Sequence, residues 1–178
     1  MATRDVKQYH LRPFWGDDFK SLDYTSEPFN DPESQATWLA MGFADKFVGD
    51  MCDMRRTQTS WNSRMIDIYS MAGWQDVGTS YYRMNPGSIL PRHSDTYRRY
   101  IELHGLQGRE QNIWRAIVFL EDWKSGHYLE VGERAITHWN AGDVVEWRYD
   151  VPHMAANMGF TPRYTLQLTG HKNGSQQK

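Results

Sequence analysis

Residues 143–170 read DVVEWRYDVPHMAANMGFTPRYTLQLTG, and this stretch decides the fold that the sequence predicts. It contains three short runs of apolar, β-branched and alternating residues, at 143–148, 152–158 and 163–170. Turn residues separate the runs, among them Gly159 and Pro162. Short runs between turn residues are typical of β-strands rather than helices. We therefore expect three consecutive strands here.

The same pattern extends upstream to about residue 63. Turn sequences such as Asn85-Pro-Gly and Asn140-Ala-Gly-Asp divide this region into further candidate strands, at 65–70, 79–85, 88–94, 112–121, 127–131 and 134–139. We find no second amphipathic helix in it. A succession of short strands favours a β-sandwich or a jelly roll over a parallel α/β sheet. The pattern alone does not choose between those two.

The N-terminal part of the chain lacks this strand pattern and contains a helix signal instead. Residues 1–30 are expected to form an irregular lead-in, with room for a short strand. Asp31 and Pro32 then supply an N-cap and a first helical residue. Apolar residues recur every four positions after that point, which predicts a helix over 32–56 whose apolar stripe packs on a sheet: Leu39, Phe43, Phe47 and Met51.

The chain has 178 residues, a length that suits one domain. We expect a single domain over 1–178. Within it, residues 1–62 would form the lead-in and helical support, 63–171 the β core and 172–178 a polar tail.

Composition narrows the possible partners and location. Twenty basic and 22 acidic residues give a net charge of -2 without any run of Lys or Arg, so we expect no nucleic-acid partner. The longest aliphatic run, 116–120, is far shorter than the roughly 20 residues of a membrane helix. The first residues lack the apolar segment of a signal peptide. A single cysteine, Cys52, cannot form an internal disulfide. A cytoplasmic protein that binds no membrane is the expectation.

His93-Ser94-Asp95 is the one place where a carboxylate follows a histidine at the second position. On an extended strand these two side chains project to the same face. A third ligand from a distant strand would complete a set of two histidines and one carboxylate, which leaves three adjacent coordination positions open on a metal ion. The pair alone is equally compatible with a surface histidine beside an aspartate.

Two later segments add to this pair. His153 lies in the candidate strand 152–158, and Arg163 opens the strand 163–170. Alternation along that strand places Arg163, Thr165 and Gln167 on one face. A guanidinium and a hydroxyl on a common face are well suited to binding a carboxylate.

The order and spacing of these residues resemble those of the 2-oxoglutarate- and Fe(II)-dependent oxygenases. The similarity consists of His93-x-Asp95, a distal His153, Arg163 ten residues later, and Thr165 two residues beyond it. It extends over residues 79–170.

Within that family, one branch is most similar. Trp139-Asn-Ala-Gly-Asp143, followed by His153-xxx-Asn157 and Arg163-x-Thr165, resembles the aspartyl/asparaginyl β-hydroxylase and cis-proline hydroxylase branch. This resemblance implies a double-stranded β-helix, a cupin-like jelly roll with N-terminal helices, and a metal site at its open end. It also implies hydroxylation of an amino-acid side chain, free or in a peptide.

Carried over by position, the resemblance assigns the site. His93, Asp95 and His153 would be the catalytic metal ligands and would bind Fe(II). Arg163 and Thr165 would bind the distal carboxylate of 2-oxoglutarate. With O2, the cosubstrate would be converted to succinate and CO2 as a C–H bond is hydroxylated.

Two further residues are candidates for binding the cosubstrate. Arg115 alternates with Ile117 and Phe119 along the strand 112–121. A charge that faces a barrel interior is costly unless it meets an anion, so Arg115 either binds a carboxylate or faces solvent. Tyr82, on the strand 79–85, either reaches the cosubstrate or packs in the core.

Two other functional classes remain open. One is a cupin-like metalloenzyme that does not use 2-oxoglutarate. The other is a non-catalytic β-sandwich that binds a sugar or peptide through its aromatic residues, which make up 14% of the chain. In the leading interpretation the partner is a small-molecule or peptide substrate.

Overall fold

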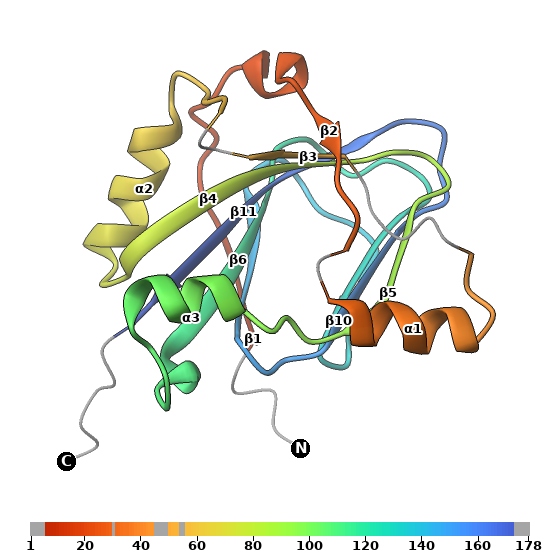
Figure 1. Cartoon of the computed structure of the whole chain (residues 1–178). Coiled ribbons are helices and arrows are strands. Elements are labelled where there is room, and N and C mark those ends of the chain that lie inside the picture. The colour runs from red at the N-terminus through yellow and green to blue at the C-terminus, as the bar shows by residue number, and fades with distance from the viewer. Residues whose placement is uncertain (1–5, 30, 45–49, 54–55, 173–178) are drawn as a thin grey trace.

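Two antiparallel sheets form the framework of this computed structural model, which describes residues 6–29, 31–44, 50–53 and 56–172 (Figure 1). The larger sheet has the order β1-β9-β6-β11-β4-β3-β2 and the smaller one β5-β10-β7-β8. The strands of the larger sheet are β1 (Val6–His10), β2 (Thr25–Ser26), β3 (Asp50–Asp53), β4 (Gln75–Met84), β6 (Ile113–Phe119), β9 (Asp143–Arg148) and β11 (Arg163–His171). Those of the smaller sheet are β5 (Ile89–His93), β7 (His127–Val131), β8 (Arg134–Ile136) and β10 (His153–Asn157). The predicted fold class, a mainly β jelly roll of the double-stranded β-helix type, is confirmed.

The candidate strands from residue 79 onward coincide with β4 to β11. The strand predicted at 65–70 is wrong, because these residues belong to helix α2 (Asn62–Met71). Its buried residues, Asn62, Met65 and Tyr69, follow the three- and four-residue spacing of a helix face that packs on the larger sheet. A short apolar run is compatible with either period, which is why the pattern misled.

The helix predicted over 32–56 is confirmed only at its start. Helix α1 covers Pro32–Ala40, and Gly42 follows at φ +88°. The N–H of Gly42 donates to the carbonyl of Leu39, so this left-handed glycine closes the helix. Residues 50–53, expected to be helical, form strand β3 instead.

The described part of the predicted apolar stripe is exposed and does not form a buried face. Leu39 and Phe43 are exposed, whereas Trp38 is the buried residue of α1. Phe47 lies outside the described residues, and Met51 lies in β3.

Residues of the expected lead-in also build the larger sheet. β1 pairs with β9 at one edge, and β2 and β3 extend the other edge beyond β4. A third helix, α3 (Arg98–His104), follows the smaller sheet's first strand, and short 3-10 helices occupy Asp17–Ser21 and Glu110–Asn112. None of the described helices is long and apolar enough to cross a bilayer.

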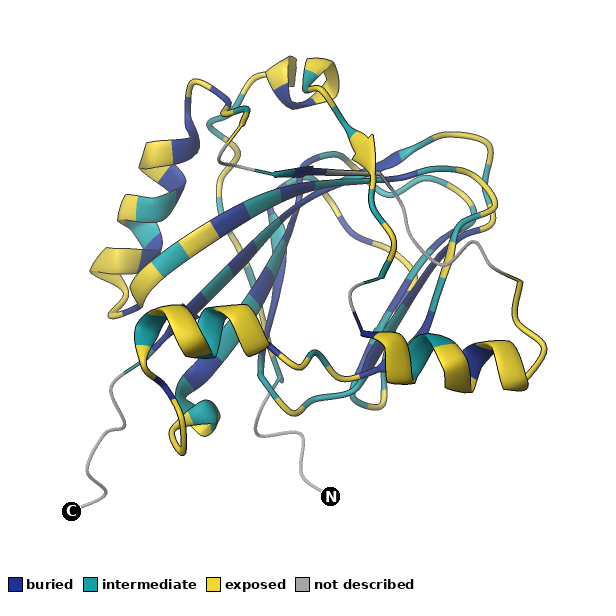
Figure 2. Cartoon of the chain, in the orientation of Figure 1, coloured by how far each residue is buried: buried dark blue, intermediate teal, exposed yellow. Residues whose placement is uncertain are grey.

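The central strands of the larger sheet, β6, β9 and β11, are mostly buried (Figure 2). One face packs against α2 and the N-terminal segment, where Leu166 and Leu168 of β11 are fully buried. The other face meets the smaller sheet in a second core that includes Phe119 and Trp147. Arg163, Thr165 and Gln167 line a cavity on that inner face, so the predicted division of strand 163–170 into two faces is confirmed.

Gly126 lies where two turns meet before the start of β7. Its φ is +91°, and a Cβ there would lie 2.2 Å from the backbone nitrogen of Gly159. The N–H of Met158 donates to the carbonyl of Gly126 at 2.8 Å, which holds the turns together. Gly126→Ala is therefore expected to lower the free energy of unfolding by at least about 2 kcal/mol.

The matched control is Gly87→Ala. Gly87 has a similar φ of +80° but open space around its Cα, so it tests the conformational cost alone. That cost is about 1 kcal/mol. Thermal unfolding of both variants measures the difference, and equal losses would contradict the steric argument.

Candidate metal and ligand site

His93 and His153 face each other across the smaller sheet. β5 and β10 are antiparallel, and these two residues are direct partners in the register. Their ring centroids lie 4.4 Å apart. The Nδ1 of His93 is 2.7 Å from the carbonyl of Pro91, and that of His153 is 3.2 Å from the carbonyl of Val151. A carbonyl can only accept, so each Nδ1 donates, and in a neutral imidazole of this tautomer Nε2 carries the lone pair that a metal ligand needs.

Asp95 completes the predicted set of ligands, but it lies in the segment after a strand and not on the strand itself. It lies two residues beyond the end of β5, not on the strand with His93. Its Oδ1 is 3.7 Å from Nε2 of His93, and its Oδ2 is 3.5 Å from Nε2 of His153. The ligand atoms of the three residues lie within 4.8 Å of one another.

The donor set fits a divalent transition metal. Two imidazole nitrogens and one carboxylate oxygen match the ligands of non-haem iron sites, and they also bind Zn(II), Mn(II) or Ni(II). The carboxylate of Asp95 lies between these imidazoles and Arg115, whose Nη1 is 3.1 Å from Oδ2. Both Nδ1 atoms are committed to backbone carbonyls, so the two Nε2 atoms and the carboxylate are the atoms left to hold such an ion.

The protonation states suit metal binding as well. Burial favours the neutral form of Asp95, but the charges of Arg115 and of the two histidines outweigh it and hold the pKa of Asp95 well below its usual range. Burial lowers the pKa of His153 to about 4, against the opposing charge of Asp95. At neutral pH the site therefore offers a carboxylate and an uncharged His153 imidazole.

A cavity of about 180 Å³ opens beside these ligands between the two sheets. Its apolar wall includes Leu90, Ile117 and Leu129. All seven predicted site residues line it: Tyr82, His93, Asp95, Arg115, His153, Arg163 and Thr165. The structure thus brings the predicted residues to one place, while their individual roles stay predictions.

Arg163 is a buried cation at one part of this cavity. Its Nη1 donates to the carbonyl of Tyr128 at 2.6 Å, and its Nε has no acceptor among the described residues. No carboxylate of the described chain forms an ion pair with it. Burial lowers the pKa of Arg163 to about 10, so the guanidinium stays protonated at neutral pH. Thr165 follows on the same face and pairs across the sheet with Tyr82.

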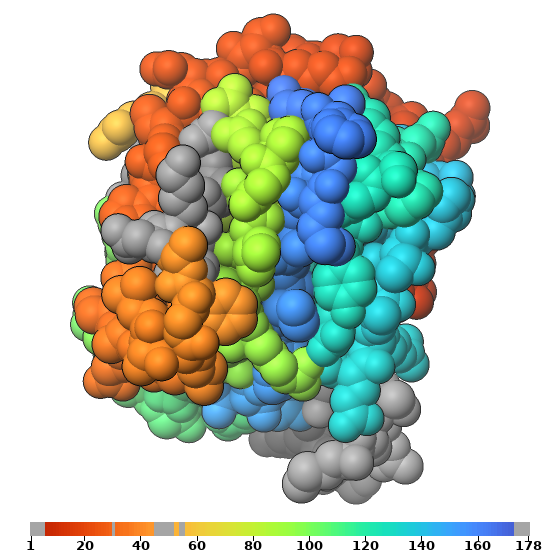
Figure 3. Space-filling view, turned by 90° about the vertical axis from the view of Figure 1, so that its right-hand side faces the viewer, coloured from red at the N-terminus to blue at the C-terminus, as the bar shows by residue number. Residues whose placement is uncertain are grey.

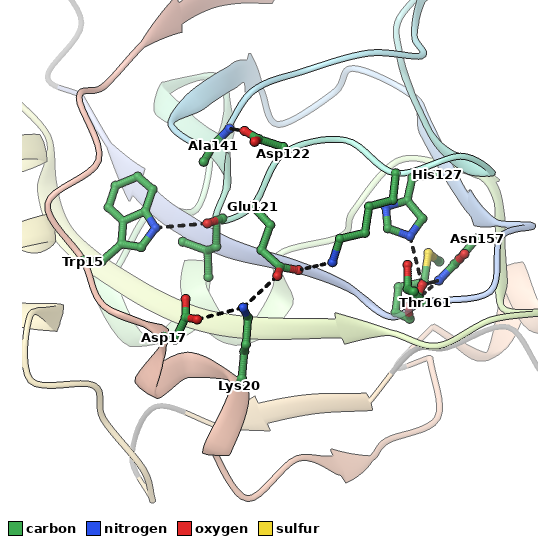
Figure 4. Close-up of polar contacts among 12 residues, drawn as sticks. Trp15, Asp17, Lys20, Glu121, Asp122, His127, Ala141, Asn157 and Thr161 are labelled. Atoms are coloured by element: carbon green, nitrogen blue, oxygen red, sulfur yellow. Dashed lines mark hydrogen bonds and ion pairs between the residues drawn. The ribbon is translucent and has the colours of Figure 1, made fainter.

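Hydrogen bonds from His127 and Asn157 hold the turn that leads into Arg163 (Figure 4). The carbonyl of Thr161 lies 2.9 Å from His127 Nε2 and accepts a hydrogen bond from the side-chain amide of Asn157. Asn157 is fully buried and also donates to the carbonyl of Met84. These contacts place the start of β11, and with it Arg163.

Arg115 lies in the cavity wall, where a carboxylate of the chain already meets it. Its Nη1 lies 3.1 Å from Oδ2 of Asp95. The alternative that Arg115 faces solvent is therefore wrong, since its side chain is 13% exposed.

Sequence reasoning missed several residues of the site. Phe29 and Trp38 lie edge-on to the His93 ring, with centroids 4.7 and 5.6 Å away. Figure 3 shows α1, in orange, lying beside the green segment that contains β5. Neither residue belongs to a motif, so no local signal predicted them.

Trp147 and Gln167 also line the cavity, although the sequence did not predict them as contacts. Trp147 is fully buried 5.0 Å from the His153 ring, and its indole N–H has no acceptor among the described residues. Alternation along β9 was available as a signal, since Trp147 shares the inward face with Val145.

Comparison with known proteins shows the fold. No protein-family model matches the chain, and no curated protein matches its sequence. The crystal structure of a Pseudomonas putida prolyl-4-hydroxylase is similar, with a TM-score of 0.57, 16% identity, and coverage of 96% of this chain and 94% of that one. SnoK, a non-haem α-ketoglutarate-dependent carbocyclase from nogalamycin biosynthesis, has a TM-score of 0.55 at 10% identity, covering 95% and 81%. The chain therefore shares its overall fold with these two enzymes.

Proposed function

We propose that this chain is a 2-oxoglutarate- and Fe(II)-dependent dioxygenase that hydroxylates an unactivated C–H bond. One observation carries the proposal: a single cavity contains the set His93, Asp95 and His153 together with the buried cation Arg163. A three-ligand metal site needs further ligands from small molecules, and a buried cation without a counter-ion needs an anion. A 2-oxo dicarboxylic acid supplies both.

Each group has a distinct task in this proposal. His93, Asp95 and His153 would hold Fe(II) through two Nε2 atoms and one carboxylate oxygen. Arg163 and Thr165, with Tyr82 across the sheet, would bind the distal carboxylate of 2-oxoglutarate. Bound iron and cosubstrate would supply oxidative decarboxylation with O2, yielding succinate, CO2 and the hydroxylated product.

The walls of the cavity serve the same chemistry. Phe29, Trp38 and Trp147 pack against the histidine rings, and aliphatic side chains complete the apolar lining. Such walls exclude water and fix the imidazoles in one orientation. The protein thereby positions the cosubstrate and the target bond while protecting the site from side reactions.

The finer assignment concerns the substrate. We propose an amino-acid side chain, free or in a peptide, as in the aspartyl/asparaginyl β-hydroxylase and cis-proline hydroxylase branch. The motif order from Trp139 to Thr165 supports this, as does the fold similarity to a prolyl-4-hydroxylase. We further expect action in the cytoplasm, on a small molecule or peptide and not on nucleic acid or a membrane.

The test uses the full chain under anaerobic conditions. Adding Fe(II) and then 2-oxoglutarate is expected to produce the visible charge-transfer absorption of a chelated 2-oxo acid. Admitting O2 with a panel of free amino acids and peptides should then release succinate, most strongly with the true substrate. Metal binding without absorption or succinate would favour the cupin-like enzyme that does not use 2-oxoglutarate. Absence of metal binding would favour the non-catalytic module.

A further inference from the structure

Arg115 is engaged by Asp95, one of the three candidate ligands. Nη1 of the arginine lies 3.1 Å from Oδ2 of the aspartate, and the two side chains are 13% and 17% exposed. At such burial, an ion pair is screened far less than one in water. The contact therefore restrains where the carboxylate of Asp95 lies.

The backbone beneath Arg115 is held on both sides. β6 lies between β9 and β11, and Arg115 pairs in register with Trp147 on one strand and Thr169 on the other. A strand paired on both edges cannot shift without breaking hydrogen bonds on two ladders. Arg115 is thus a fixed point on the larger sheet.

A second contact ties Arg115 to the segment that contains Asp95. The guanidinium carbon lies 4.8 Å from the centre of the Tyr97 ring. Tyr97 is buried and has a left-handed backbone with φ 51° and ψ 20°. Such a conformation is unfavourable for a non-glycine residue and persists only when the surroundings hold it. Arg115 therefore contacts this segment at two points, two residues apart.

The histidines and the aspartate are positioned in different ways. Strand pairing within the smaller sheet sets His93 against His153. Asp95 lies beyond β5, so that pairing does not set its carboxylate. The restraint on Asp95 comes from the opposite sheet, through Arg115.

We propose that Arg115 is a positioning residue that holds Oδ2 of Asp95, so that only Oδ1 is presented to a metal ion. This rests on the proposed function and deepens it. A cation near Oδ2 would also lie near the guanidinium and be repelled by it. Without Arg115, both carboxylate oxygens can bind one ion, and the second oxygen then takes a coordination position that a 2-oxo acid needs.

The experiment counts the water molecules on bound Mn(II), a redox-stable substitute for Fe(II). Water-proton relaxation of the Mn(II)-loaded full chain reports how many exchangeable waters the ion carries. Arg115→Gln is expected to lower this relaxivity by about one third, because two waters replace three on a six-coordinate ion. Affinity of the Mn(II) form for N-oxalylglycine, an inert 2-oxoglutarate analogue, should fall at least about tenfold, measured by calorimetry.

Matched variants separate this role from others. Arg92 precedes His93 in the chain but is exposed and paired with Glu130 outside the cavity, so Arg92→Gln should keep the wild-type relaxivity. Arg115→Lys keeps the charge and should restore most of the relaxivity. If Arg115→Gln fails to fold, Arg115→Met carries the same expectation.

Other results overturn the proposal. Unchanged relaxivity with weakened N-oxalylglycine binding would make Arg115 a direct contact of the cosubstrate. Unchanged relaxivity with lowered thermal stability would make its role structural. A wild-type chain that binds no Mn(II) would overturn both this proposal and the proposed function. If Arg115→Gln loses one water on bound Mn(II) as predicted but the wild-type chain never releases succinate, the proposed function alone would be overturned.

Discussion

Arg163→Met is expected to abolish binding of 2-oxoglutarate while the protein stays folded. The guanidinium is buried and has no ion-pair partner among the described residues, so it is the group whose charge an incoming carboxylate would neutralise. Losing a buried charge-assisted pair typically costs about 2 to 5 kcal/mol, which corresponds to at least about a 30-fold weaker affinity. Calorimetric titration of the Mn(II)-loaded variant with 2-oxoglutarate measures this loss.

Stability should respond differently from binding. Because an unpaired buried charge is costly, replacing it by an apolar side chain of similar length should change thermal stability little. The lost hydrogen bond to the carbonyl of Tyr128 sets the size of the residual effect. Arg134→Met, on strand β8 outside the cavity lining, is the control and should bind 2-oxoglutarate normally. Full succinate release by Arg163→Met would remove the assignment of this residue.

His153→Ala is expected to lose the metal. Its Nε2 is one of three candidate ligand atoms, and its Nδ1 is committed to the carbonyl of Val151. Even an outer partner of a metal ligand is typically worth about 10- to 100-fold in affinity, so removal of a ligand should cost at least about 100-fold. Titration with Mn(II), followed by electron paramagnetic resonance of the free ion, measures the change.

His138→Ala is the control for this variant. His138 is exposed and lies against Trp123, away from the cavity lining. It should leave both Mn(II) affinity and succinate release unchanged. Stoichiometric Mn(II) binding by a folded His153→Ala protein would show that the cation, if any, is held elsewhere.

The sequence predicted the strands well where turns punctuated it. From residue 79 onward, turn sequences such as Asn85-Pro-Gly divide the chain, and alternation then fixes which face each side chain takes. Alternation along a single strand was therefore sufficient to predict that Arg163 and Thr165 share a face. The same reasoning failed for the segment 65–70. A short apolar run fits a helix face as well as a strand, so the pattern did not identify the helix.

The remainder of the site depends on contacts that local patterns do not encode. Alternation left open whether Arg115 faces inward or faces solvent, and it could not predict the contact with Asp95, which comes from an irregular segment after β5. Phe29 and Trp38 reach His93 from a part of the chain more than fifty residues earlier. Only the three-dimensional arrangement of the N-terminal segment brings them there. The single-domain organisation over 1–178 stays a prediction.

The direct pairing of His93 with His153 restricts how this chain can vary in length. Successive residues of a strand point to opposite sides, so inserting or deleting one residue within β5 or β10 would turn one imidazole away from its partner. The register shift between His153 and Ala155 in the pairing of β10 with β5 is therefore expected to be kept in homologues that use both histidines. Homologues that keep the chemistry should accumulate their insertions and deletions in the connecting segments, leaving the spacing around these two histidines intact.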